Sequence, residues 1–381
     1  MRGIKVYLQK PFGILDSSYY KYLREGVPDN VEYVEKGEAG LVGVGKFGKS
    51  FWLKQFIKKI LRFFNLSFVN VYYSNVEGVD VIHCVNCMSK NRGPWIADLE
   101  HVGHFWWGSC AKCKVKIIDG KFIKNFNVRA KDKVREYLCS GYCKKIIAWS
   151  EWTKNNIIRE FPEIKNKIEV VYPAIKPQKK AKRKSRKFRI LFVGRDFGIK
   201  GGEVALRVIN ELMKKYSNVE GVMVSDVPNK FLDLYSGNKR IRFVGLVPKD
   251  ELFEKFYPFA DIFLYPTFSD TFGFAILEAK SFGLPVVAMR TMSTHTIDET
   301  VSDRVNGFVV DNLGINGFHG KFDDSIVDRF VEAVEKLIGD KKLLKKMSRA
   351  SFRDVVNGKF SIVVRNKKLG RIYRVAAGAL R

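Results

Sequence analysis

Two carboxylates stand eight residues apart in the segment 265–288. Asp270 lies on a polar turn after an apolar run, and Glu278 lies inside the helical pattern that follows Phe272 and Gly273. Carboxylates placed in this way can face one polar ligand, and the backbone N–H groups at a helix N-terminus favour an anion. The segment therefore predicts a polar-ligand site with a phosphate component. Spacing alone also allows an Asp that caps the helix and a Glu on its surface.

A basic, glycine-rich loop follows the apolar run 188–194. It contains Gly194, Arg195, Lys200 and Gly201, and an amphipathic pattern begins at Glu203. Arginine can grip two phosphate oxygens, lysine acts as a point charge, and glycines let the backbone approach a ligand closely. Cations placed in advance stabilise the negative charge that develops on a departing phosphate. The alternative is a solvated basic loop.

Together these two segments closely resemble the signatures of the retaining GT-B glycosyltransferases of family 4 (glycosyl transferases group 1), which transfer a sugar from a nucleotide-sugar donor. One difference is that Asp270 stands where the family usually has Glu, so its carboxylate is one methylene shorter. Similarity to the family extends over most of the chain, although the match in the N-terminal half is less specific.

The resemblance implies a role for each motif residue. Arg195 and Lys200 are expected to bind the donor diphosphate, Asp270 to bind the sugar, and Glu278 to bind the ribose, and these four form the expected catalytic set. The whole expected donor site consists of Gly194, Arg195, Lys200, Gly201, Asp270, Thr271, Phe272, Gly273 and Glu278. The resemblance further implies a hexosyltransferase that uses a UDP-, GDP- or ADP-sugar and requires no cofactor or metal for catalysis.

The chain divides at the basic run 176–189, in which nine of fourteen residues are Lys or Arg and none is acidic. Such a run repels itself and buries little, so we expect a solvated linker. Short apolar runs alternate with amphipathic segments on both sides of it, which predicts an α/β fold with parallel sheets. The runs lie at 4–8, 79–84, 145–149 and 168–172, and then at 188–194, 221–225, 241–244, 261–266 and 285–288.

With the resemblance, this alternation predicts a GT-B fold, in which two doubly wound, Rossmann-like domains face a central cleft. We expect an acceptor-binding domain at 1–175 and a nucleotide-sugar-binding domain at 190–350. The segment 351–381 is expected to form a C-terminal helix that crosses back to the first domain.

Residues 43–50, GVGKFGKS, satisfy the pattern of a phosphate-binding P-loop. A P-loop nucleotidase is therefore one alternative function. The motif lacks a convincing preceding strand and a partner Asp for magnesium, so we favour a loop whose backbone contacts the acceptor or the donor phosphate. Gly45 and Lys46 are the candidate acceptor residues there. Further candidates are His83, Asp98, Glu100 and His101.

Cys84 and Cys87 form one C-x-x-C pair, and Cys110 and Cys113 form another. Paired cysteines of this kind are typical of structural zinc sites with four thiolate ligands. The family resemblance does not imply a zinc ion here, and free thiols or disulfides remain as alternatives.

The chain of 381 residues carries 68 Lys and Arg against 40 Asp and Glu, a formal net charge of +28. Hydrophobic residues make up 46%, which excludes a disordered chain or a fibre. A nucleic-acid-binding protein is a second alternative function, but no nucleic-acid-binding module is recognisable and a nucleic-acid partner is not expected.

The basic residues gather in the run 176–189, in the aromatic and basic segment 51–64, and in the stretch 341–381. This distribution predicts a peripheral enzyme on an anionic membrane with a lipid-linked sugar or phospholipid as acceptor. No secretory signal or spanning segment is recognised, so we expect the protein in the cytoplasm, at the inner face of the cell membrane.

Overall fold

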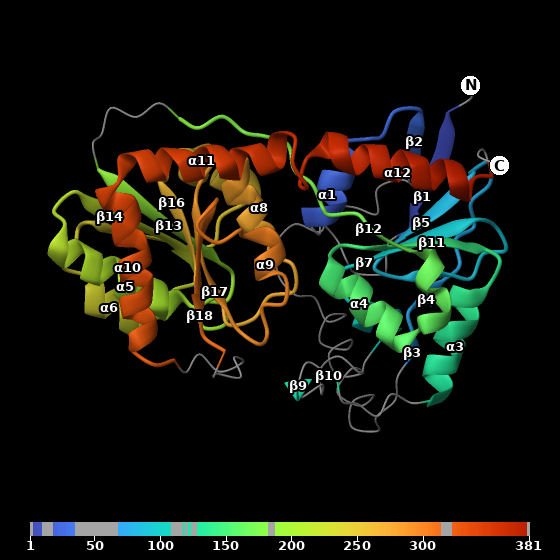
Figure 1. Ribbon diagram of the computed structural model, residues 1–381, viewed down its shortest axis with the longest axis horizontal. Coiled ribbons are helices and arrows are strands. Elements are labelled where there is room, and N and C mark those ends of the chain that lie inside the picture. The colour runs from blue at the N-terminus through green and yellow to red at the C-terminus, as the bar shows by residue number, and fades with distance from the viewer. Residues whose placement is uncertain are drawn as a thin grey trace. The chain divides into compact units, whose positions relative to one another are not determined.

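The computed structural model describes residues 3–9, 18–34, 68–107, 117–118, 121–122, 128–181, 187–313 and 322–378 (Figure 1). The chain forms two compact units. The first comprises Met1–Pro173 with Arg365–Arg381, and the second comprises Ala174–Val364. Each unit is built on a parallel sheet of six strands, so the predicted α/β class with two parallel-sheet domains is confirmed.

The sheet of the first unit has the order β12-β11-β7-β5-β1-β2. Its central strands β5 and β7 are buried along their whole length, as expected for strands covered on both faces. Strands β2 and β7 were not among the predicted strands. The strand bounds are β1 Ile4–Gln9, β2 Val31–Val34, β5 Val81–Val85, β7 Trp95–Leu99, β11 Cys143–Ala148 and β12 Ile168–Val170.

Helices and short strand pairs complete the described part of the first unit. The helices are α1 Ser18–Glu25, η1 Val102–Phe105, α3 Val128–Cys139, α4 Glu151–Glu160, η3 Pro162–Lys167 and α12 Ile362–Ala376. The strand pairs are β3 Phe68–Val69 with β8 Trp106–Trp107, β4 Val71–Tyr72 with β6 Met88–Ser89, and β9 Ile117–Ile118 with β10 Lys121–Phe122.

The sheet of the second unit has the order β15-β14-β13-β16-β17-β18. If these strands are numbered 1 to 6 as they occur in the sequence, the order is 3-2-1-4-5-6, which is that of a dinucleotide-binding Rossmann sheet. All six strands are parallel, and the order in which they are added to the sheet reverses between strands 1 and 4, which are β13 and β16. The strand bounds are β13 Phe188–Gly194, β14 Val219–Ser225, β15 Ile241–Val244, β16 Ile262–Tyr265, β17 Val286–Arg290 and β18 Gly307–Asp311.

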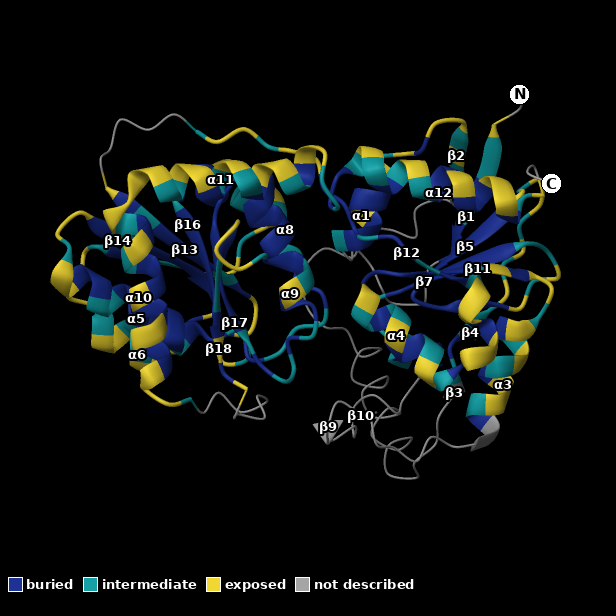
Figure 2. Cartoon of the chain, viewed as in Figure 1, coloured by how far each residue is buried: buried dark blue, intermediate teal, exposed yellow. Residues whose placement is uncertain are grey.

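Alternate residues of β13 pack into two separate cores. Ile190 and Phe192 join a cluster with side chains of α5 and α10, whereas Leu191 joins a cluster with side chains of α8. Helices therefore cover both faces of this sheet, and the buried residues concentrate in its strands (Figure 2). The helices are α5 Gly202–Lys215, α6 Asn229–Tyr235, α7 Lys249–Glu251, η4 Leu252–Phe256, η5 Tyr257–Phe259, α8 Phe274–Ser281, α9 Ile297–Thr300, α10 Ser325–Gly339 and α11 Lys341–Val356.

The segment expected to be a solvated linker is partly integrated into the second unit. The backbone of Gln178 donates to the carbonyl of Ser281 (2.8 Å), and that of Ala181 donates to Pro258 (3.1 Å). Strand β13 already begins at Phe188. The second unit thus starts at Ala174. The backbone before the charged run makes hydrogen bonds to this unit, and the backbone after it forms the strand β13.

The C-terminal segment is two helices, whereas one crossing helix was expected at 351–381. Helix α11 ends at Val356, and α12 begins at Ile362. Only the chain from Arg365 onward belongs to the first unit. Within the described residues, no helix has both the length and the apolar character needed to cross a membrane.

Candidate functional site

The strand order of the second unit favours a ligand site beside the carboxyl ends of β13 and β16. These neighbouring strands pair in parallel, and the order of the sheet reverses between them. In doubly wound sheets, ligands bind at such a point. The loop after β13 carries Arg195 and Lys200, and the loop after β16 carries Asp270 and Gly273. The sheet therefore brings together the two motifs that the sequence analysis singled out.

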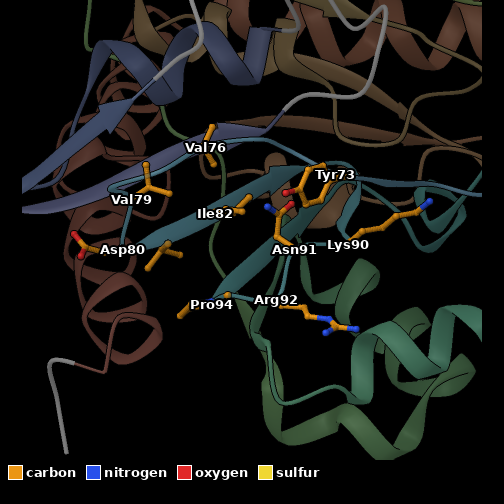
Figure 3. A pocket seen from close by; sticks show the side chains of 11 residues that line it. Tyr73, Val76, Val79, Asp80, Ile82, Lys90, Asn91, Arg92 and Pro94 are labelled. Carbon is orange, nitrogen blue, oxygen red and sulfur yellow. The ribbon is translucent and has the colours of Figure 1, made fainter.

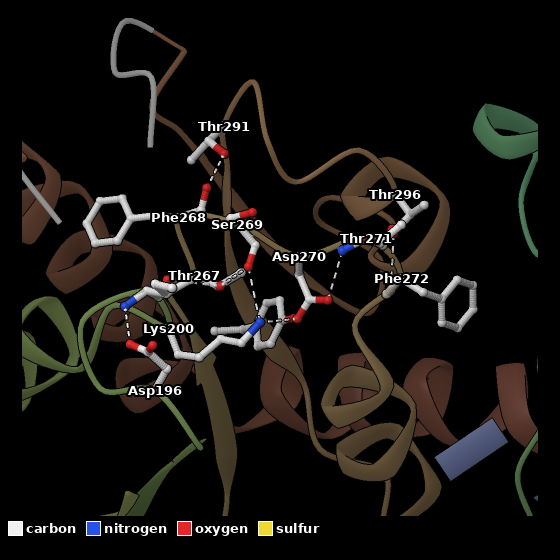
Figure 4. A network of polar contacts seen from close by, with 12 residues as sticks. Asp196, Lys200, Thr267, Phe268, Ser269, Asp270, Thr271, Phe272, Thr291 and Thr296 are labelled. Carbon is white, nitrogen blue, oxygen red and sulfur yellow. Dashed lines mark hydrogen bonds and ion pairs between the residues drawn. The ribbon is translucent and has the colours of Figure 1, made fainter. Parts of the chain in front are cut away.

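Lys200 and Asp270 meet across these two loops (Figure 4). The Lys200 ammonium lies 2.6 Å from Asp270 Oδ2 and donates to the carbonyl of Ser269 at 3.1 Å. The Tyr265 hydroxyl donates to the same carboxylate oxygen, and the backbone of Thr271 donates to the other at 2.9 Å. Both side chains stay about one quarter exposed, so a ligand can reach the pair.

Two glycines in left-handed conformations shape these loops. Gly201 has φ 76°, and a Cβ there would lie 1.9 Å from the carbonyl oxygen of Pro266. Gly273 has φ 82° and immediately precedes α8. A side chain at Gly201 would force the loops apart, because its Cβ would overlap backbone rather than a flexible side chain. A cavity of about 240 Å³ adjoins both loops and is lined in part by Phe197, Gly201 and Phe268.

A threonine-rich segment after β17 braces the acidic loop. Thr291 Oγ1 donates to the carbonyl of Phe268 at 2.9 Å, and Thr296 Oγ1 donates to that of Thr271 at 2.9 Å (Figure 4). These threonines were not among the predicted site residues. Their only signal in the sequence is that they follow the next strand of the same sheet, so their loop returns to the same edge.

Glu278 lies in α8 and is only 6% exposed. Its Oε2 accepts a hydrogen bond from the Tyr257 hydroxyl at 3.1 Å, and its Oε1 lies 2.8 Å from the Lys249 ammonium. Burial, and then the charge of Glu278, raise the pKa of Tyr257 well above its ordinary value, so this hydroxyl keeps its proton and donates. Sequence reasoning missed both partners, because they lie 21 and 29 residues away along the chain.

Arg195 is exposed and directly follows the last residue of β13. No described acidic side chain forms an ion pair with it, so its guanidinium is available to an anion. A buried Gly194 precedes it, and a Cβ at that glycine would lie 2.8 Å from Cβ of Lys200.

In the first unit, His83 and Asp98 form a closed buried network. Both side chains are fully buried, and His83 Nε2 lies 2.7 Å from Asp98 Oδ2. His83 Nδ1 lies 2.7 Å from the Tyr373 hydroxyl, which also contacts the Tyr33 hydroxyl at 3.1 Å. The network leaves neither His83 nor Asp98 a surface for an acceptor, in contrast to the role that the sequence suggested. Its geometry is that of a polar core joining β5, β7 and α12.

Glu100 and His101 lie directly beyond the carboxyl end of β7 and are partly exposed. His101 Nδ1 accepts from the backbone of Gly103 at 3.0 Å, so the proton of its neutral ring sits on Nε2. The ring of His104 lies 4.0 Å from that of His101, and its Nε2 lies 3.6 Å from Glu100 Oε2. Burial lowers the pKa of His101 to about 3 and that of His104 to about 4, which keeps both rings neutral at physiological pH.

The predicted cysteine site consists of two C-x-x-C pairs, of which one lies among the described residues. Cys84 and Cys87 are buried, and burial, followed by the neighbouring Cys87, raises the pKa of Cys84 well above its ordinary value. Cys110 and Cys113 lie outside the described residues, as do Gly45, Lys46 and the whole of 43–50 and 51–64. Among the described residues, no group of three or more potential ligands is placed to hold a metal ion. The four-thiolate zinc site stays a prediction.

A cavity of about 400 Å³ opens in the first unit (Figure 3). Residues before and at the start of β5, including Asp80 and Ile82, line it together with Arg92 and Pro94, which precede β7. It therefore lies at the amino ends of these parallel strands, away from the edge at which Glu100 and His101 follow β7.

Comparison with known proteins supports the prediction of the fold. Sucrose-phosphate synthase from Thermosynechococcus elongatus is similar in structure over 100% of this chain and 100% of its own, with a TM-score of 0.60 and 13% sequence identity. The chain has the GT-B fold. Within this GT-B chain, residues 187–340 match the family model described as Glycosyl transferases group 1, and the match contains both loops of the candidate site.

Curated relatives match parts of this GT-B chain. An uncharacterized glycosyltransferase of Methanocaldococcus jannaschii is 27% identical over 260 residues, which cover 62% of this chain and 63% of that protein. The phosphatidylinositol N-acetylglucosaminyltransferase GPI3 subunit of Saccharomyces cerevisiae is 27% identical over 174 residues, or 42% of this chain and 37% of that protein. The chain spans less than two thirds of the length of these curated relatives.

Proposed function

We propose that this protein is a retaining glycosyltransferase that moves a hexose from a nucleotide-diphosphate sugar to an acceptor. The observation that carries the proposal is the ion pair between Lys200 and Asp270. The pair lies where the strand order of the sheet reverses, in a domain that matches the family model of glycosyl transferases group 1. A cation and a carboxylate side by side suit a ligand with an anionic part and a hydroxyl-rich part, as a nucleotide sugar has.

In the proposed complex, Arg195 and Lys200 bind the diphosphate. Donor binding exchanges the ion pair of Lys200 and Asp270 for contacts with the ligand: the ammonium turns to a phosphate oxygen, and the carboxylate accepts from sugar hydroxyls. Negative charge grows on the leaving diphosphate as the glycosidic bond breaks, so two fixed cations stabilise the transition state more than the bound donor. These side chains supply the charge that a catalytic metal would otherwise supply.

Transfer proceeds on one face of the sugar. The bond from the anomeric carbon to the phosphate oxygen breaks, and the acceptor oxygen bonds to the same carbon from the same side. The acceptor proton passes to the departing phosphate oxygen, so a nucleoside diphosphate leaves. The backbone at Phe272 and Gly273, just before α8, supports the sugar and phosphate as the helix N-terminus favours negative charge.

Glu278 is proposed to hold the ribose of the donor. Tyr257 and Lys249 fix its carboxylate from two sides, so the group is already oriented before the donor arrives. Such preorganisation reduces the conformational entropy that binding would otherwise cost.

The first unit is proposed to bind the acceptor, with Glu100 and His101 as the contacting residues. Their position beyond the carboxyl end of β7 supports this role, because ligands of parallel sheets bind at that edge. A lipid-linked acceptor is supported by the similarity to the yeast subunit, which is named for transfer to phosphatidylinositol. This acceptor would place the protein at the cytoplasmic surface of a membrane.

A thermal-shift panel of UDP-, GDP- and ADP-sugars tests the donor site. We expect one nucleotide to raise the melting temperature, because a ligand at one hundred times its Kd stabilises the folded state by about 2.7 kcal/mol. Glu278→Gln should remove most of the shift. Asp270→Asn should keep the shift with the free nucleoside diphosphate and lose the added effect of the sugar.

The matched control is Glu299→Gln, a change of the same kind on a partly exposed carboxylate of α9. ATP is included to detect a P-loop nucleotidase. A panel in which no nucleotide sugar stabilises the wild type, or in which Glu299→Gln acts like Glu278→Gln, would contradict the proposed donor site.

A further inference from the structure

Helix α11 presents a basic face that the donor site does not use. Half of its sixteen residues are exposed, and with 3.6 residues per turn these eight fall within an arc of about 140°. The eight are Lys341, Lys342, Lys345, Lys346, Arg349, Phe352, Arg353 and Val356. This set is called the basic face below. It combines six cations with two apolar side chains and holds no acidic residue.

The opposite side of α11 is fixed to the second unit. Met347, Ser351 and Val355 are buried, and the Ser351 hydroxyl donates to the carbonyl of Asn306 at 2.9 Å. The helix has one acidic residue, Asp354, and it turns inward to the buried ammonium of Lys280. The orientation of the helix, and therefore of the basic face, is set by these contacts.

The cations of the basic face have no acidic partner among the described side chains. Acids elsewhere in the second unit do pair, for example Glu335 with Lys215 and Asp324 with Arg207. The six charges of α11 therefore repel one another on the surface. Repulsion of this kind costs stability, and an anionic surface that binds there would relieve it.

The apolar residues of the basic face indicate which anionic surface fits. Phe352 is 36% exposed and Val356 is 42% exposed, and both lie inside the arc of cations. A sixteen-residue helix is about 24 Å long, so its basic face offers several turns of contact to an extended anionic surface. Anionic headgroups attract the cations while the two apolar side chains enter the headgroup boundary. A nucleic acid would attract the cations but offer Val356 no apolar surroundings.

We propose that the basic face of α11 docks the protein on an anionic lipid bilayer. The proposal deepens the suggested lipid-linked acceptor by naming the surface that meets the membrane. It can be tested without a donor, so a failure of docking and a failure of the donor site are distinguished.

Vesicle sedimentation with the full chain tests the proposal. We expect binding to vesicles of phosphatidylcholine with phosphatidylglycerol, little binding to phosphatidylcholine alone, and a decrease with salt. Each cation near an anionic bilayer contributes about fivefold in affinity, so Lys345→Glu with Arg349→Glu should lose about 25-fold or more. Phe352→Ser should weaken binding without changing the salt dependence.

The matched control is Lys165→Glu with Lys239→Glu, which changes the net charge equally at two exposed positions outside α11. It should lose far less affinity than the pair in α11. Equal losses in the two pairs, or equal binding to neutral and anionic vesicles, would overturn the proposal. So would tighter binding to a nucleic-acid duplex at the same salt, abolished by the α11 pair. The melting temperature of each variant without ligand verifies that the protein is folded.

Discussion

Two carboxylates of the candidate site in the second unit are each paired with a lysine. Lys200 contacts Asp270 directly, and Lys249 contacts Glu278. The first pair is partly exposed and can separate, whereas Glu278 is nearly buried and held on two sides. We infer that the side chains of the first pair exchange partners when the donor binds, whereas the second pair stays intact and keeps Glu278 in its orientation.

His101 and His104 in the first unit predict a dependence of stability on pH. Burial lowers the pKa of His101 to about 3 and that of His104 to about 4, below the value of about 6.5 in an unfolded chain. Between pH 6.5 and 4 the unfolded chain therefore binds more protons, and stability falls as the pH falls. Each histidine contributes at most about 2 kcal/mol between pH 6.5 and 5.

Urea unfolding followed by tryptophan fluorescence measures this effect in the first unit, because all six tryptophans lie within residues 52–152. The variant His101→Gln with His104→Gln should show a flatter decline between pH 7 and 5 than the wild type. Equal slopes for the two proteins would refute the expectation.

Between elements, the site depends on the close approach of two loops. The loop after β13 and the loop after β16 touch where Gly201 meets Pro266, and the backbone of Phe268 donates to the carbonyl of Ile199 at 2.9 Å. The threonines after β17 support the second loop from its other side. The loops after three neighbouring strands of the sheet, β13, β16 and β17, thus hold Asp270 in position.

Gly201→Ala is therefore expected to damage the site. The substitution adds a left-handed backbone cost and an overlap with Pro266, together about 2 to 5 kcal/mol of unfolding free energy. Nucleotide-sugar binding should weaken because the loops separate. The comparison is Gly237→Ala, where a Cβ meets no atom within 4 Å. The melting temperature and the nucleotide-induced thermal shift are measured for both variants. A Gly201→Ala protein as stable as Gly237→Ala would contradict the expected overlap with Pro266.

The whole molecule is two units joined by a chain that leaves the first and returns to it through α12. The buried Arg365 donates to the carbonyls of Tyr22 and Gly26, and Tyr373 of the same helix contacts His83. Buried side chains of α12 therefore belong to the core of the first unit.

Tyr373→Phe should destabilise the first unit and spare the second. The change removes the hydroxyl between His83 and Tyr33 and leaves buried polar atoms without a partner, at a cost of about 1–3 kcal/mol. Tryptophan fluorescence should report the loss, while the nucleotide-induced thermal shift persists. Arg374→Ala, a change at the adjacent exposed residue, serves as the control. A loss of nucleotide binding in Tyr373→Phe would show that the units do not respond separately.

Much of the fold was predictable from local patterns. Apolar runs marked β1, β5, β11 and β12 in the first unit, and the two motifs of the second unit were placed on the loops that carry them. Strand β7 was missed because its sequence, WIADL, contains Asp98, which was interpreted as a candidate acceptor residue rather than as part of a buried strand. Inside the folded unit this aspartate pairs with His83 and becomes part of the core.

The sequence by itself determined the α/β class, the two motifs of the candidate site and the chemistry of their residues, because these depend on residue type and short spacing. Only the tertiary structure decided which groups meet. Lys249 and Tyr257 reach Glu278, and the threonines after β17 reach the acidic loop, through the order of strands in the sheet. The same order buries His83 and Asp98 and leaves one face of α11 outside. Contacts between distant segments follow from sheet topology, which no local pattern contains.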